Sequence, residues 1–216
     1  MRKLFAAVAM VCLGVSGLLA HGDNSHFAGK QDVTVKTTKV SGNVYMLQGQ
    51  GGNVGAINGP DGILIVDDDY KAVSEKLRDA LKELGSPTPR YILNTHWHGD
   101  HTEGNDLFGK SGSTIIAHSN VRKRVLDPPV IFGQKTPPYA AYALPIVTYT
   151  QSMSLHLDGE DIKLVYYPNG HTDGDSVVFF AKANVVHLGD DFFVGRFPFV
   201  PQTGKRKKLA VFPFDM

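Results

Sequence analysis

Alternating hydrophobic and polar positions mark the first third of the chain as a series of short strands. The alternation begins at Val33, and turn-forming glycine, proline and asparagine residues separate the apolar segments. Three consecutive aspartates, beginning at Asp67, follow the last segment. The predicted strands cover residues 33–40, 44–47, 54–57 and 63–66, the first two antiparallel across a turn near Gly42.

Helical spacing replaces this alternation over residues 71–84, and Gly85 predicts the end of the helix. Residues 127–150 contain five prolines with aromatic residues between them and predict a long covering loop. Further strands are predicted over residues 91–93, 114–117, 154–157, 162–167, 176–181 and 185–188, and a second helix over 119–126. Two sets of strands, each accompanied by helix, predict an α/β or α+β sandwich of sheets with helices outside.

Residues 1–20 differ from the rest of the chain, because two basic residues precede an uncharged, mostly apolar run that ends at Ala20. This pattern predicts a secretory signal peptide, cut after Ala20 or earlier, after Ser16 or Gly17. The alternative is a transmembrane anchor, for which the apolar run is near the lower length limit. We therefore expect an exported protein, periplasmic or secreted, without stable membrane insertion. Residues 21–32 are polar and predict a flexible stretch.

Composition narrows the class of protein. The 216 residues include 22 Lys and Arg against 21 Asp and Glu, with 42% hydrophobic residues, which is typical of one soluble domain. The small net charge gives no reason to expect nucleic acid or an anionic membrane as a partner. The single cysteine, Cys12, lies in the predicted signal peptide, so any metal must be held by histidine and carboxylate. Oligomeric state is not indicated.

A cluster of metal-ligand residues follows the apolar strand at 91–93. His96, His98, Asp100 and His101 fall within six residues. Imidazole and carboxylate oxygen are the usual ligands of zinc and similar metals, and Gly99 gives the tight loop its backbone freedom. The alternative is a run of exposed polar residues, which seldom places four candidate ligands directly after a buried strand.

Two further segments also place a possible metal ligand just after a predicted strand. Gly170-His171-Thr172 follows the predicted strand at 162–167, and Gly189-Asp190 follows the strand at 185–188. Several strand ends are therefore expected to converge on one edge of the sandwich. Two neighbours of these segments are assigned to packing, because His187 lies in an apolar strand and Phe192 in an aromatic run.

With these motifs together, the chain resembles the metallo-β-lactamase-fold superfamily over about residues 33–199. The matching segments are His-x-His-x-Asp-His at 96–101, Gly-His-Thr at 170–172 and Gly-Asp at 189–190, in the family's order. The resemblance implies an α+β fold, a four-layer αβ/βα sandwich, with its last part missing here. The domain would cover residues 33–200, followed by an atypical basic tail at 201–216.

The resemblance also implies a role for each matching residue. The first metal would be held by His96, His98 and His171, the second by Asp100 and His101, and Asp190 would bridge the two. Asp67 would steady the ligand loop by hydrogen bonds, or would be a simple strand-end carboxylate. The expected cofactor is zinc, two ions per chain in the full-length family, with iron or manganese also compatible.

The implied reaction is metal-dependent hydrolysis. A water or hydroxide between the ions would attack an ester, thioester, lactone, lactam or phosphodiester, and Asp100 would orient it. His101 resembles the third lactamase subclass. Asp190 resembles the broader group of thioesterases, lactonases and phosphodiesterases.

The chain departs from the family after about Val200. The family's further histidine for the second metal has no counterpart after Asp190. We expect from this a truncated chain whose second metal site is incomplete. Two alternatives to an active hydrolase follow: a catalytically impaired metal-binding module, and an iron-dependent oxidoreductase of the same fold.

Overall fold

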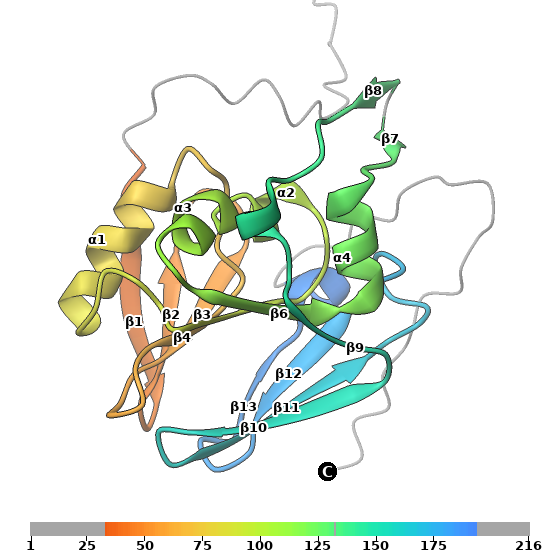
Figure 1. Ribbon diagram of the computed structural model, residues 1–216. Helices are drawn as coiled ribbons and strands as arrows, with labels where there is room; N and C mark the ends of the chain where they lie inside the picture. Colours follow the sequence, from red (N-terminus) through yellow and green to blue (C-terminus); the bar gives the residue numbers. More distant parts are fainter. Residues whose placement is uncertain (1–32, 132, 194–216) are drawn as a thin grey trace, which may run out of the picture. The chain divides into compact units, whose positions relative to one another are not determined.

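The computed structural model describes residues 33–131 and 133–193, and Figure 1 labels their helices and strands. The predicted signal peptide at 1–20, the stretch at 21–32 and the tail at 201–216 lie outside the described residues. No helix within the described ranges is long and apolar enough to cross a membrane.

A sheet of seven strands, in the order β1-β2-β3-β4-β5-β6-β9, forms the larger half of the described fold. Neighbours from β1 to β4 are antiparallel, which confirms the predicted strand pairs, and those from β4 to β9 are parallel. The bounds are β1 Lys36–Ser41, β2 Val44–Gln48, β3 Asn53–Ile57, β4 Leu64–Val66, β5 Tyr91–Asn94, β6 Thr114–His118 and β9 Val147–Tyr149. Parallel strands place their carboxyl ends at one edge, where the candidate ligands begin.

Helices connect the parallel strands. The first, α1 (Ser74–Leu84), buries Leu77 and Leu81 on one face, as its spacing predicts. Gly85, at φ 139°, ends it by donating its backbone N–H to the carbonyls of Leu81 and Lys82. The others are α2 (Gly99–Thr102), α3 (Asn105–Lys110) and α4 (Ser119–Leu126).

The second sheet has four antiparallel strands in chain order. They are β10 Ser152–Leu157, β11 Glu160–Tyr166, β12 Ser176–Phe180 and β13 Val185–His187. All four match predicted strands, with ends that differ by one or two residues.

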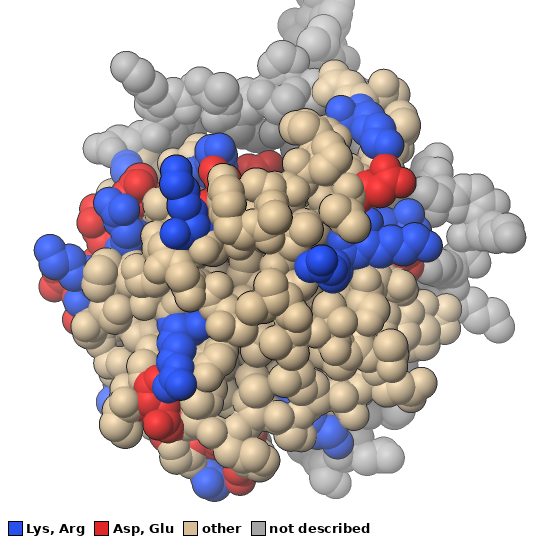
Figure 2. Space-filling view, in the orientation of Figure 1, with Lys and Arg blue, Asp and Glu red and all other residues tan. Residues whose placement is uncertain are grey.

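Two apolar cores hold these layers together. One lies between the sheets, where Leu93 and Ile116 of the larger sheet meet Leu164 and Phe180 of the smaller. The other lies between the larger sheet and the helices, where Phe108 of α3 and Leu77 of α1 are fully buried. The described layers are therefore helix, sheet and sheet (Figure 1), and the α+β class is confirmed. Basic and acidic side chains are interspersed on the face shown in Figure 2.

The structure corrects two expectations. Residues 127–150 are not a single loop, because they contain β7 (Val130–Ile131), β8 (Gln134–Lys135), the 3₁₀ turn η1 (Ala141–Ala143) and β9. Of these, β9 pairs with β6 at the edge of the larger sheet. The prolines that precede it, the last at Pro145, obscure in the sequence a three-residue strand that tertiary pairing stabilises. Residues 99–102, predicted as part of a loop, are helical, and the helix at 105–110 was not predicted, because both segments are too short to show a helical period.

Candidate metal centre

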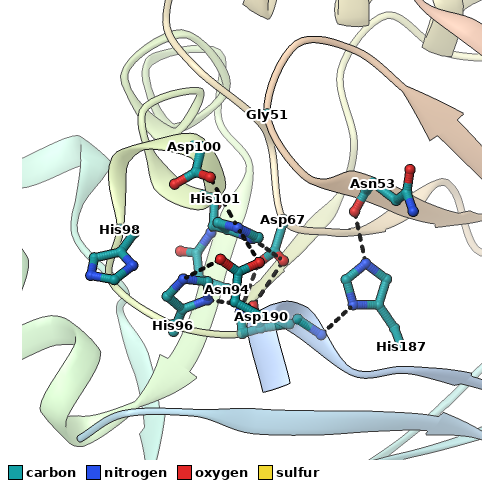
Figure 3. A network of polar contacts seen from close by, with 12 residues as sticks. Gly51, Asn53, Asp67, Asn94, His96, His98, Asp100, His101, His187 and Asp190 are labelled. Atoms are coloured by element: carbon teal, nitrogen blue, oxygen red, sulfur yellow. Dashed lines mark hydrogen bonds and ion pairs between the residues drawn. The ribbon is translucent and has the colours of Figure 1, made fainter. Parts of the chain in front are cut away.

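The six predicted ligands come from four segments that follow strand ends. His96 and His98 follow β5, and Asp100 and His101 lie in α2, directly after them. His171 follows β11, and Asp190 lies in the 3₁₀ turn η2 (Gly189–Asp191) after β13. Figure 3 shows five of these side chains gathered at one place, with Asp190 beside His96 and His101.

The first group of possible ligands contains His96, His98, His171 and Asp190, whose ligand atoms all lie within 4.8 Å of one another. Nε2 of His171 lies 3.0 Å from Nδ1 of His98 and 3.6 Å from Oδ2 of Asp190. Nε2 of His96 lies 4.0 Å from the same carboxylate oxygen. Three imidazole nitrogens and one carboxylate oxygen are a common zinc donor set.

The second group contains Asp100, His101 and Asp190. Nε2 of His101 lies 3.1 Å from Oδ1 of Asp190 and 3.5 Å from Oδ2 of Asp100. Asp190 therefore directs one carboxylate oxygen toward each group, as a bridging ligand would. Among the described residues, the first group offers four donors and the second offers three.

Electrostatics favour neutral imidazoles at His96 and His98 of the first group. Burial, followed by the neighbouring imidazoles, lowers the pKa of His96 well below its usual range. Burial and the adjacent His171 lower the pKa of His98 to about 4. A neutral imidazole keeps a nitrogen lone pair for a metal. Nε2 of His96 is fully buried without a hydrogen bond, and buried polar atoms rarely stay unsatisfied. The residues present therefore fit a metal ion.

Asp67 lies beneath the second group, in a left-handed backbone conformation at φ 64°. Its Oδ1 accepts the backbone N–H of Thr95 at 2.7 Å, and its Oδ2 accepts the Thr95 hydroxyl at 2.8 Å. The N–H at Nδ1 of His101 donates to Oδ2 at 2.8 Å. Burial opposes the charged form of His101, but the charge of Asp67 and the hydrogen bonds to Asp100, Asp190 and Asp67 together outweigh it, and the pKa of His101 is raised. The bond to Asp67 also directs Nε2 of His101 toward Asp190.

The sequence did not reveal how Asp69 contributes. Its carboxylate accepts the backbone N–H groups of Gln50, Gly51 and Tyr70 at 3.0, 2.9 and 2.7 Å. It thus holds the loop between β2 and β3 against the second group. The sequence shows both the aspartates at 67–69 and the Gly51-Gly52 pair, but no local pattern indicates that these distant segments are in contact.

Gly52 leaves room for His101, since an added Cβ would lie 2.7 Å from Cε1 of the imidazole. We expect Gly52→Ala to displace His101 and to weaken metal binding at the second group about tenfold or more. The measurement is zinc affinity of the full chain by competition with a chromophoric chelator. Gly55→Ala is the matched control, because its Cβ would lie 3.2 Å from Cδ2 of His187 and 3.4 Å from Cβ of Val66, neither of which belongs to the two ligand groups. Equal affinities in the two variants would contradict the role of Gly52.

Two packing assignments were wrong. His187 is only partly buried, and its ring contacts the backbone carbonyl of Asn53 through Nε2 at 2.8 Å (Figure 3). Phe192 is 58% exposed. The apolar neighbours of His187 suggested a core position, yet among the described strands β13 pairs with β12 alone, and its residues are partly buried or exposed.

Comparison with known protein families matches residues 37–211 to the metallo-beta-lactamase superfamily. The chain belongs to that superfamily. This result confirms the resemblance seen in the motifs, and the placement of the ligand-type residues at strand ends agrees with it.

Individual relatives of the superfamily are more distant. A hydroxyacylglutathione hydrolase of Pelagibacter ubique (strain HTCC1062) is 28% identical over 105 residues, which cover 48% of this chain and 36% of that protein. A subclass B3 metallo-beta-lactamase of Bradyrhizobium japonicum has a TM-score of 0.59 at 19% identity, over 68% of this chain and 57% of its own.

A class B3 di-zinc metallo-beta-lactamase from an Alaskan soil metagenome has a TM-score of 0.60 at 19% identity, over 69% of this chain and 58% of its own. At these identities the solved structures establish the fold alone. The chain thus spans about a third of the hydrolase and less than two thirds of either lactamase.

Proposed function

We propose that this protein is a metal-dependent hydrolase. The observation that carries the proposal is the pair of ligand groups that share Asp190, with the buried Nε2 of His96 lacking a hydrogen bond. The expected metal is zinc, since imidazole and carboxylate ligands suit it and the described residues offer no thiolate.

The assignment of ligands follows the two groups. His96, His98, His171 and Asp190 would hold the first ion, and Asp100, His101 and Asp190 the second. When bound, the metal lowers the pKa of a coordinated water and polarises the substrate's carbonyl or phosphoryl group. Burial raises the pKa of Asp100, but the hydrogen bond and charge of His101 outweigh this and lower it, so the carboxylate is ionised and can orient a water by accepting its hydrogen bond.

The proposed substrate is a small molecule with an ester, thioester, lactone, lactam or phosphodiester bond. Support comes from the relatives, which are hydrolases by name: a hydroxyacylglutathione hydrolase and B3 metallo-beta-lactamases. The predicted signal peptide would place the reaction in the periplasm or outside the cell.

The test is a substrate panel with the zinc-loaded full chain. It contains a chromogenic lactam, a thioester, a lactone and an activated phosphodiester. We expect turnover of at least one class, and a loss of about a hundredfold or more in His98→Ala, because a ligand of the first group is removed. His156→Ala is the control, since His156 is exposed and bonded only to Asp161 on the second sheet.

One observation favours a second candidate, a metal-binding module without turnover. The second group has only three donors among the described residues, so its ion would be held less tightly than the first. Absence of turnover on every substrate, with zinc, iron or manganese supplied and one ion still tightly bound, would reject the hydrolase and favour the module.

A further inference from the structure

A second polar cluster lies beside the metal centre and is not used by the proposed reaction. At its middle is Asp173, two residues after His171. Its Oδ1 accepts the indole N–H of Trp97 at 3.1 Å. Its Oδ2 receives Nη2 of Arg124 at 2.6 Å and Nε at 3.1 Å, a two-pronged guanidinium–carboxylate contact. One side chain thus joins the loop of Trp97, the loop of His171 and the helix α4.

The backbone of Asp173 is held as firmly as its side chain. Its carbonyl accepts Nδ2 of Asn120, at the start of α4, and the hydroxyl of Tyr166, at 3.2 Å, at the end of β11. The Tyr166 ring stacks on His118, with centroids 3.8 Å apart and planes 4° from parallel. These contacts do not involve the carboxylate, so variants of the side chain are expected to fold while losing the link to Trp97 and Arg124.

Trp97 connects this polar cluster to the first ligand group. Trp97 stands between His96 and His98, and its ring meets the His98 ring edge-on at 4.4 Å. The bond from Trp97 to Asp173 spans 76 residues of sequence and connects the two loops that carry His98 and His171. The rings of those two histidines face each other, with Nε2 of His171 3.0 Å from Nδ1 of His98.

Global stability is a poor explanation for this arrangement. The side chains of Arg124 and Asp173 are 35% and 31% exposed, and ion pairs at that exposure contribute little to folding. Arg124 is one of three consecutive basic residues on α4, and Figure 2 shows basic side chains gathered over this helix. What distinguishes Arg124 and Asp173 is that together they orient the indole nitrogen of a residue flanked by two ligands.

We propose that Asp173 is a positioning residue: by joining Trp97 to Arg124, it fixes His171 relative to His98 and sets the metal affinity and geometry of the first ligand group. The inference rests on the proposed function, since it takes the first group as a metal site. Asp173 itself contacts neither metal nor substrate in this account.

The experiment compares zinc affinity and the visible spectrum of the cobalt(II)-substituted full chain. We expect Asp173→Ala to weaken zinc binding about 10- to 100-fold and to change the cobalt spectrum at saturation. Asp173→Asn keeps one acceptor oxygen and should fall between the parent and Asp173→Ala. Trp97→Phe removes only the indole donor and should weaken binding several-fold. Combining it with Asp173→Ala should add less than twofold, because both changes break the same bond.

The control is Asp127→Asn, which removes an exposed ion pair to Lys135 just after α4 and should leave affinity and spectrum unchanged. A parent-like affinity and spectrum in Asp173→Ala and Trp97→Phe, whatever their melting temperatures, would overturn the positioning role and leave the proposed function standing. A parent chain that binds neither zinc nor cobalt would overturn both.

Discussion

Zinc is expected to raise the melting temperature of the metal-free full chain by about 8 to 16 °C at a thousandfold excess over its dissociation constant. A ligand that binds only the folded state adds about 4 kcal/mol of stability at that excess. For a chain of this size each kcal/mol corresponds to about 2–4 °C. The physical source is the first ligand group, where Nε2 of His96 is buried without a partner and the pKa of His98 is lowered to about 4.

The measurement is a thermal unfolding curve of the metal-free chain with increasing zinc, and again with magnesium. Magnesium prefers oxygen ligands and should have little effect on a site of three imidazoles and one carboxylate. His98→Ala should lose most of the zinc-dependent rise. An equal rise in parent and variant would mean that zinc stabilises the fold elsewhere.

Asp67→Ala is expected to destabilise the folded chain by on the order of 5 kcal/mol. Asp67 is 1% exposed and accepts hydrogen bonds from the backbone and hydroxyl of Thr95 and from His101. Each buried donor left without an acceptor costs about 1–3 kcal/mol, and alanine in a left-handed conformation adds about 1–2 kcal/mol. The loss is comparable with the whole stability of many domains.

Denaturant unfolding of the metal-free chains measures this loss. Asp67→Asn tolerates the left-handed backbone and keeps one acceptor, so a smaller loss of about 1–3 kcal/mol is expected. Asp79→Ala, at an exposed position on α1, should stay within about 0.5 kcal/mol of the parent. The account of Asp67 is wrong if Asp67→Ala unfolds at the same denaturant concentration as Asp79→Ala.

The sequence predicted well those features that short segments determine. The helix over 119–126 matches α4 residue for residue, and the stop at Gly85 matches its left-handed backbone. The ligand cluster at 96–101 was visible because its donors are adjacent in sequence. The structure then brings His171 and Asp190 to that loop, because β11 and β13 end at the same edge. The metal-binding roles of these residues stay predictions.

Contacts between distant segments could not be predicted in this way. The bond from Trp97 to Asp173 joins residues 76 positions apart, and Asp69 holds a loop 18 and 19 positions before it. No periodicity encodes either contact. The strand β9 was missed for a related reason, since its three residues are a strand only because β6 lies beside them. For His187 the local pattern was misleading instead: its apolar neighbours in the sequence predicted a buried side chain, but the side chain is only partly buried in β13.

Metal content after equilibrium dialysis tests the central claim most directly. The metal-free full chain, His98→Ala and the control His156→Ala are dialysed against zinc buffered at low free concentration, and zinc per chain is then measured. We expect one tightly held ion in the parent and in His156→Ala, a second only at higher free zinc, and no tightly held ion in His98→Ala. The same zinc content in His98→Ala as in the parent, or none in the parent, would contradict a metal centre built on His96, His98, His171 and Asp190.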